Sequence, residues 1–224
     1  RILSSAASDV YKRQLLNYEI RAMQITTIKE LREIYEQPKG RAVSKQLDYL
    51  DRHSLKFLKL SPFCILATFG KDGLADATPR GGKPGFIQNS DVKTLLIPDW
   101  PGNNRLDSLE NIISNQGVGL LFLVPGIKET LRVNGSAEII TDSDLKARFW
   151  DKDRLPLSII KVEIQEVFLH CSKAFIRSAL WDPESIQPRS ILPSMGEMLK
   201  DQTGDPGKIE SQQEMELRYS KTLY

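Results

Sequence analysis

Short apolar runs and apolar–polar alternation indicate that the middle of the chain is built from β-strands. We expect six strands, at residues 63–69, 74–78, 92–97, 118–124, 129–141 and 157–169. In the fifth, Leu131, Val133 and Ala137 fall on one face, because successive side chains of a strand point to opposite sides. Between the first two strands, Asp72-Gly73 predicts a tight hairpin turn, because this pair adopts the positive φ that such turns need.

Helical periodicity surrounds this region. Thr27 with Glu30 three residues later has the pattern of a capping box and predicts the start of a helix. A second helix is expected over residues 41–58, with Val43 and Leu47 on one face. Further helices are expected at residues 105–114, 142–150 and 208–221. This order predicts a mainly β fold with flanking helices (α+β), and it favours an antiparallel barrel over a doubly wound parallel sheet.

The sequence divides into three expected parts. Residues 1–22 are interpreted as a non-native or disordered leader, because they begin with an aperiodic stretch whose SDVYKRQ string looks like translated sequencing adapter. The native start then falls near Met23. Residues 23–182 are expected to form the barrel domain with its N-terminal helices, and residues 183–224 a Pro-rich linker followed by a helical arm.

Composition excludes several classes of function. The 31 Lys and Arg residues nearly balance the 29 Asp and Glu residues, and the resulting net charge of +2 argues against a nucleic-acid partner. The longest apolar run, residues 118–124, is far shorter than the roughly 18 residues of a membrane span, so no membrane partner is expected. The two cysteines, Cys64 and Cys171, favour a reducing, cytoplasmic setting. With two histidines in the whole chain, no multi-histidine metal site is expected, so any chemistry comes mostly from a bound molecule.

Three segments have the residue types of a ligand-binding site. At residues 77–86, two glycines let a ligand approach the backbone while Arg80 and Lys83 flank them with positive charge. At residues 97–105, a loop rich in Gly and Asn leads into a helix start that can offer backbone N–H groups and a guanidinium to a phosphate. The third segment, residues 128–135, ends in Asn-Gly. Each also has a purely structural interpretation: a solvated turn, a capped helix with a surface arginine, and a strand that ends in a turn.

The order of these motifs is more specific than any one of them. PRGGKPGF, IPDWPGNNRLDSLENI, GLLFLVPG and ETLRVNG follow one another, and HCSKAFIRSALW closes the series. In this order the chain resembles the FMN-binding split barrels related to pyridoxamine 5′-phosphate oxidase, and more narrowly their FMN-dependent branch with a PRG-PGF motif. The resemblance covers about residues 44–183. It implies a six-stranded antiparallel split β-barrel and a homodimer that binds FMN at each end of the subunit interface.

The resemblance also implies a set of cofactor-binding residues. Arg80 and Lys83 would hold the phosphate and ribityl side of FMN, together with Asn104, Arg105 and Ser108 at a helix start. The remaining implied residues are Thr78, Thr130 and Arg132, Pro98 and Asp99 near the flavin ring, and His170, Lys173, Arg177 and Trp181 from the other subunit.

Two functions remain open at this point. The first is an FMN-dependent oxidoreductase, in which FMN passes a hydride or electrons between a small-molecule donor and acceptor while the protein binds and orients the flavin. The second is a non-catalytic flavin or haem binder, for which His170 is the plausible iron ligand. Oxidation of pyridoxamine phosphate itself is not expected, because no arginine and histidine pattern of that enzyme follows Trp181. No catalytic residue is assigned, and Cys64 is expected to be a small buried residue.

Overall fold

The computed structural model describes residues 24–204, 207 and 209–222, and the chain divides into two compact units, residues 1–44 and 45–224. In the first unit, helix α2 (Ile28–Ile34) begins after Thr27, whose side chain accepts a hydrogen bond from the Glu30 N–H. The Glu30 carboxylate accepts one from the Thr27 N–H in return, so the predicted capping box is confirmed. A short helix, α3 (Arg41–Ser44), follows. The expected leader, residues 1–22, lies outside the described residues.

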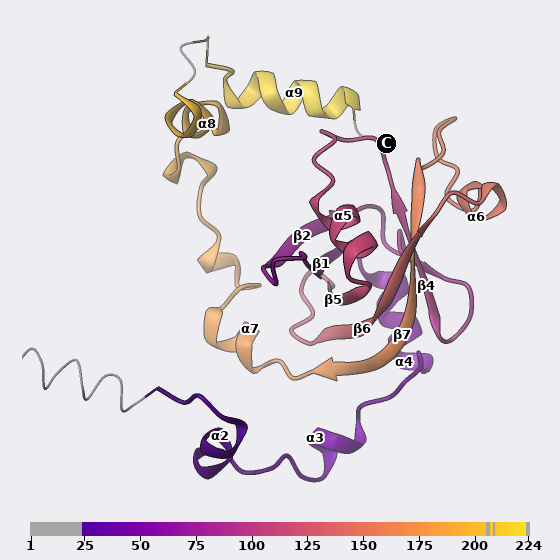
Figure 1. The fold of residues 1–224 in the computed structure, drawn as a ribbon. Helices are drawn as coiled ribbons and strands as arrows, with labels where there is room; N and C mark the ends of the chain where they lie inside the picture. Colours follow the sequence, from indigo (N-terminus) through magenta and orange to yellow (C-terminus); the bar gives the residue numbers. More distant parts are fainter. Residues whose placement is uncertain (1–23, 205–206, 208, 223–224) are drawn as a thin grey trace, which may run out of the picture. The chain divides into compact units, whose positions relative to one another are not determined.

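Seven antiparallel strands form one sheet in the second unit, in the order β2-β1-β5-β6-β7-β4-β3 (Figure 1). The strands are β1 (Phe63–Phe69), β2 (Ala75–Gly81), β3 (Gln88–Asn89), β4 (Thr94–Asp99), β5 (Gly117–Leu123), β6 (Thr130–Ile140) and β7 (Ser158–His170). The mainly β fold with flanking helices is confirmed, but the expected number of six strands is wrong. The additional strand, β3, pairs only two residues with β4, and a segment this short shows no alternation in the sequence.

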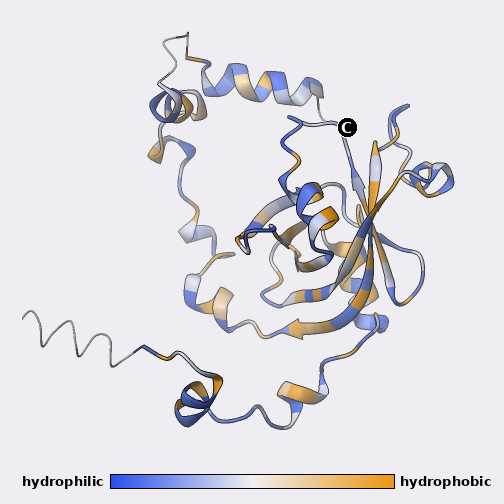
Figure 2. Ribbon diagram, viewed as in Figure 1, coloured by the Kyte–Doolittle hydropathy of each residue, from blue (hydrophilic) through white to orange (hydrophobic). Residues whose placement is uncertain are grey.

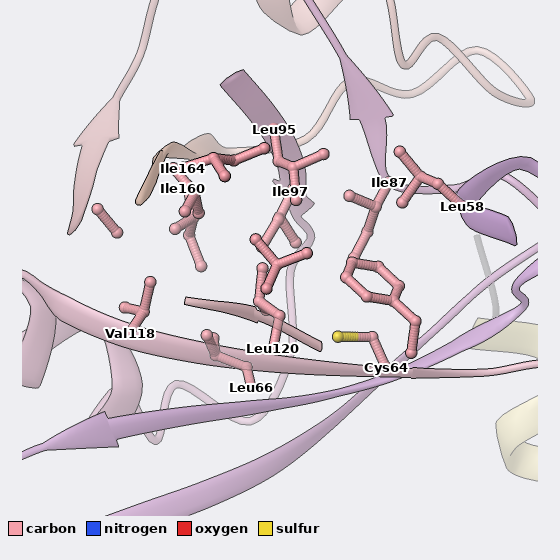
Figure 3. Close-up of a cluster of buried hydrophobic side chains, with 14 of the residues drawn as sticks. Leu58, Cys64, Leu66, Ile87, Leu95, Ile97, Val118, Leu120, Ile160 and Ile164 are labelled. Carbon is pink, nitrogen blue, oxygen red and sulfur yellow. The ribbon is translucent and has the colours of Figure 1, made fainter. Parts of the chain in front are cut away.

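The sheet curls around one hydrophobic core. Its side chains come from β1, β4, β5, β6, β7, helices α4 (Arg52–Leu60) and α5 (Asp107–Ser114), and the segments that precede α4 and β3. Those labelled in Figure 3 are Leu58, Cys64, Leu66, Ile87, Leu95, Ile97, Val118, Leu120, Ile160 and Ile164. Burial alternates along the strands, and Figure 2 shows the matching alternation of hydrophobic and hydrophilic residues along β6 and β7. Strands in opposite halves of the sheet, such as β1 and β4, contribute side chains to the same core, so the sheet is strongly curved.

A β-bulge interrupts the pairing of the two longest strands, β6 and β7. The register shifts between Asn134 and Gly135 of β6, and Gln165 of β7 has no partner residue in the ladder. This extra residue reverses the alternation along β7. Ile164 faces the core before the bulge and Val167 faces it afterwards, although the two lie an odd number of residues apart.

The predicted helix over residues 41–58 is wrong. Residues 45–51 are not helical, and within them Leu47 forms a β-bridge with Val167 of β7, with both backbone hydrogen bonds exchanged. The Leu50 N–H then donates to the carbonyl of Val92, and α4 begins after Asp51, whose carboxylate caps it. Leu47 and Leu50 have helical spacing, yet Leu47 is a half-buried residue bridged to β7 and Leu50 is buried in the core.

Helices α5 (Asp107–Ser114) and α6 (Ser143–Ala147) confirm two of the predicted helices. After β7 the chain forms α7 (Lys173–Ser178), 3₁₀ turns at Pro183–Ser185 and Arg189–Ile191, α8 (Met195–Thr203) and α9 (Gln212–Thr222). The last confirms the predicted C-terminal helix, whereas α7 and α8 were not predicted. Within the described residues, no helix is both long enough and apolar enough to cross a membrane.

Gly135 at the bulge provides a test of this packing. A Cβ at this position would overlap the backbone carbonyl of Glu163, which cannot move without breaking the β6–β7 ladder. We expect Gly135→Ala to lower the free energy of unfolding by roughly 2–3 kcal/mol in a denaturant titration. Gly119→Ala is the control, because a Cβ there makes only ordinary contacts, at 3.4 Å to Asn134 and 3.8 Å to Ala67. Equal effects of the two variants would contradict the bulge geometry.

The two cysteines differ in their surroundings, and this difference is testable. Burial raises the pKa of the Cys64 thiol to about 12, whereas Cys171 is exposed. A thiol with a raised pKa stays protonated and unreactive well above neutral pH. At pH 8 we expect a disulfide reagent to label one thiol per native chain and two after denaturation. Rapid labelling of the folded Cys171→Ser variant would contradict this prediction.

Candidate functional site

A cavity of about 490 Å³ lies between β2, the loop after β4 and the start of α5. Strand β2 contributes Asp76, Thr78 and Arg80, which point the same way because they are two residues apart. The other lining residues are Pro79, Asp99, Trp100, Gly102, Asn103, Asn104, Arg105, Leu106, Asp107, Ser108, Leu109 and Leu157. The cavity thus brings together six residues of the sequence-predicted site: Thr78, Arg80, Asp99, Asn104, Arg105 and Ser108.

An ion pair between β2 and β4 forms one wall of this cavity. Arg80 Nη1 donates to Asp99 Oδ1 at 2.7 Å, and the two side chains are only 22% and 13% exposed. The pair joins regions that are far apart in the strand order, because β2 is the first strand and β4 is next to last. The Nε–H of Arg80 is buried without a hydrogen-bond partner in the described chain, so this guanidinium retains a donor for a ligand.

The start of α5 forms the opposite wall. Leu106 precedes the helix without a side-chain cap, which leaves backbone N–H groups of its first turn available. Ser108 in that turn is buried, and its hydroxyl lies 3.1 Å from the Thr78 hydroxyl. Asn104 has a left-handed φ of 60°, a conformation that Asn tolerates better than most residues, and it turns the loop into the helix. A helix start of this kind favours an anion.

Arg105 lies at the mouth of the cavity. Its side chain is 78% exposed, and its Nε donates to Asp107 Oδ2 at 2.6 Å. This hydrogen bond is the main reason that the pKa of Arg105 is raised, and the charge of Asp76 adds to it. Two arginines therefore face three aspartates, Asp76, Asp99 and Asp107, in one cavity.

Lys83 and Pro98 lie in a second cavity, of about 630 Å³, which shares Trp100 with the first. Four aromatic rings contribute to its lining, and Lys83 forms an ion pair with Asp151 at 2.9 Å. The full lining is Gly81, Gly82, Lys83, Phe86, Gln88, Pro98, Trp100, Arg148, Phe149, Trp150 and Asp151. The resemblance assigns Lys83, Pro98 and Arg105 to the same FMN molecule. In the structure, Lys83 and Pro98 line the second cavity and Arg105 lines the first.

Thr130, Arg132 and His170 form a separate group at one end of β6 and β7, where Thr130 pairs with His170. Arg132 Nη2 donates to Glu166 at 2.6 Å, and the Arg132 guanidinium stacks over the Phe168 ring at 4.3 Å. The pKa of His170 is lowered, chiefly by burial and then by the charges of Arg132 and Lys45. Its imidazole is therefore neutral at neutral pH.

The last three predicted residues follow β7. Lys173 and Arg177 belong to α7. Trp181 stacks on Phe175 with ring centroids 5.6 Å apart, and its Nε1–H donates to the carbonyl of Ile127. None of these three residues lines either of the two cavities described above.

Sequence reasoning missed several cavity residues, of which Asp76 and Asp107 carry charge. Asp76 had a detectable signal, because it shares the parity of Thr78 and Arg80 on one strand. Among the described residues, no group of three His, Cys, Asp or Glu side chains could hold a metal ion.

Residues 50–171, more than half of the chain, match the family model of pyridoxamine 5′-phosphate oxidase. The chain belongs to this family. Its curved antiparallel sheet has the split-barrel fold of the pyridoxamine 5′-phosphate oxidase family. The narrower PRG-PGF branch stays a prediction.

Solved structures with a similar fold are distant in sequence. HupZ from Group A Streptococcus is 18% identical, with 53% of this chain and 93% of that chain covered and a TM-score of 0.45. A putative pyridoxamine 5′-phosphate oxidase from Lactobacillus delbrueckii is 24% identical, with 55% and 98% covered and a TM-score of 0.43. An FMN-binding protein from Syntrophomonas wolfei is 12% identical, with 53% and 82% covered and a TM-score of 0.40. A search of curated proteins finds no match.

The ion pair of Arg80 and Asp99 is expected to contribute strongly to stability. Asp99→Ala leaves the half-buried guanidinium without its partner, so we expect the free energy of unfolding to fall by roughly 2–3 kcal/mol. Asp48→Ala is the matched control, because the Lys93–Asp48 pair has the same 2.7 Å distance but is exposed and should contribute little. Equal denaturation midpoints for the two variants would show that burial of the first pair does not matter.

Proposed function

We propose that the protein binds FMN in the first cavity and acts as an FMN-dependent oxidoreductase on a small molecule. The observation that carries this proposal is the convergence of six sequence-predicted residues on one cavity, from β2, the end of β4 and the chain that leads into α5. The chain also fits the cofactor chemically. The buried Nε–H of Arg80 and the uncapped start of α5 are donors that an anionic ligand would satisfy.

Arg105 and the first turn of α5 are the proposed phosphate site. A single phosphate suits this site, because the chain has no glycine-rich strand–helix turn of the kind that holds a pyrophosphate. FMN is therefore favoured over FAD. Asp107 orients Arg105, and Ser108, held by Thr78, lies in the same turn of the helix.

Bound FMN would supply hydride and electron transfer, and the residues of this chain would bind it and orient it. The second cavity is the proposed substrate side, because it shares Trp100 with the first. Its aromatic walls with Lys83 and Arg148 suit a flat molecule that carries negative charge. The Lys83–Asp151 ion pair is exposed on its lysine side, so a negatively charged substrate can compete with Asp151 for Lys83.

A homodimer belongs to the same proposal. Neither of these two cavities is lined by His170, Lys173, Arg177 or Trp181, which is consistent with a role of these residues toward a second copy. Helix α7 also exposes Ile176 and is followed by the exposed Leu180. A second copy that covers this segment would remove apolar surface from water.

The absorption spectrum of the purified protein distinguishes the proposal from the haem-binding alternative. Flavin bands near 370 and 450 nm (roughly, as for free FMN) would support an FMN protein. A Soret band would instead support haem, with the neutral imidazole of His170 as the candidate iron ligand.

Arg105 tests the phosphate site. We expect Arg105→Ala to weaken FMN binding about tenfold in a fluorescence titration, because a charge-assisted hydrogen bond to the phosphate is lost. Riboflavin, which has no phosphate, should bind the variant as it binds the wild type. Arg105→Lys should recover only part of the loss, because an ammonium lacks the planar two-point contact.

Lys71→Ala is the control for removal of one positive charge, because Lys71 is exposed in the β1–β2 turn and does not line the cavity. If folded Arg105→Ala binds FMN and riboflavin as the wild type does, the phosphate lies elsewhere.

A further inference from the structure

Asp76 is the one charged residue of the first cavity for which the described chain provides no hydrogen bond or ion pair. Arg80 pairs with Asp99 and Arg105 pairs with Asp107, so the other four charges are matched. Asp76 lies on β2, opposite Thr68 of β1, and its Oδ2 atom is buried. A buried carboxylate oxygen without a donor is costly, so the bound state is expected to supply one.

The surroundings of Asp76 do not supply this donor. The Thr68 hydroxyl accepts a hydrogen bond from Asn111 Nδ2 at 3.0 Å, and no hydrogen bond joins this hydroxyl to the buried oxygen of Asp76. Thr78, the next residue on this face of β2, is matched with Ser108. The carboxylate therefore borders a cavity in which no described side chain donates a hydrogen bond to its buried oxygen.

We propose that Asp76 accepts a hydrogen bond from a hydroxyl group of the bound ligand, so that the cavity selects a polyol chain next to an anionic group. The inference rests on the proposed function, and in FMN the corresponding part is the ribityl chain beside the phosphate. Asp76 is then a specificity-determining residue for the sugar-alcohol part of the cofactor.

Two features favour a hydroxyl over an amine or a metal ion as the donor. Asp76 is close enough to Arg105 for its charge to act on that guanidinium, so an ammonium ligand at Asp76 would face a neighbouring positive charge. Arg80 lies four residues along the same face of β2, and its buried Nε–H lacks a hydrogen-bond acceptor, whereas Asp76 lacks a donor. A chain of hydroxyls meets both needs, because each hydroxyl donates and accepts.

The test uses two neutral ligands, so that the charge of the phosphate does not contribute. Riboflavin carries the ribityl chain, and lumiflavin has a methyl group in its place. We expect wild-type protein to bind riboflavin more tightly than lumiflavin. Asp76→Asn should lower the affinity for riboflavin about tenfold, because a charge-assisted hydrogen bond is lost, and should leave the affinity for lumiflavin unchanged.

Asp72→Asn is the matched control, because it removes the same charge four residues away, in the β1–β2 turn outside the cavity. Its amide oxygen can still accept the hydrogen bond from the Leu74 N–H, so the turn is retained. Thermal unfolding of each variant verifies that it is folded, and Asp76→Glu serves as a second variant that keeps the carboxylate.

The outcomes separate the inference from the proposed function. An unchanged riboflavin-to-lumiflavin ratio in Asp76→Asn overturns the inference, and it means that water alone satisfies the carboxylate. Tighter FMN binding by Asp76→Asn with both neutral ligands unaffected also overturns it, because the carboxylate then acts only through its charge. Wild-type protein that binds none of the three flavins overturns the proposed function, and the inference fails with it.

Discussion

The ion pair between Arg80 and Asp99 is the interaction on which the arrangement of the site depends. It joins the first strand of the sheet, β2, to the end of β4, where the strand still pairs with β7 but no longer with β3. This contact is possible because the sheet curves around one core that side chains from both of its halves fill. Arg80 and Asp99 line the first cavity, their chain neighbours Gly81 and Pro98 line the second, and Trp100 lines both, so the two cavities adjoin near this contact.

The strands could be predicted because each buries one face, which imposes a period of two on the sequence. Residues 63–69 are a clear example, where the expected and observed strands coincide. The segment around Leu47 could not be predicted in this way. Its apolar spacing fits a helix, and the partner that makes it extended, Val167, lies more than a hundred residues along the chain. Strand β3 was missed for a different reason, because two paired residues carry no periodicity.

The candidate site was predictable to the extent that its residues lie in contiguous motifs. Arg80, Asp99 and Arg105 are in such motifs, and the fold brings all three to one cavity. Lys83 lies in the same motif as Arg80 but lines the neighbouring cavity, since the chain leaves β2 between them. The role inferred for Asp76 could not be predicted from the sequence, because it depends on a buried carboxylate oxygen that has no hydrogen-bond donor. The lack of a donor can be recognised only in three dimensions, where the atoms around the carboxylate are known.

The bulge at Gln165 has a consequence for the outer surface of the barrel. A single unpaired residue shifts the phase of β7, so that Val167 continues the buried set while Glu166 and Phe168 point outward toward Arg132. If Gln165 were paired in a regular ladder, the unbroken period of two would turn the Glu166 carboxylate inward in place of Val167. The inward-facing positions of β7 therefore change parity at the bulge. The unpaired residue keeps apolar side chains on the core side and charged and aromatic side chains on the outer side on both sides of the bulge.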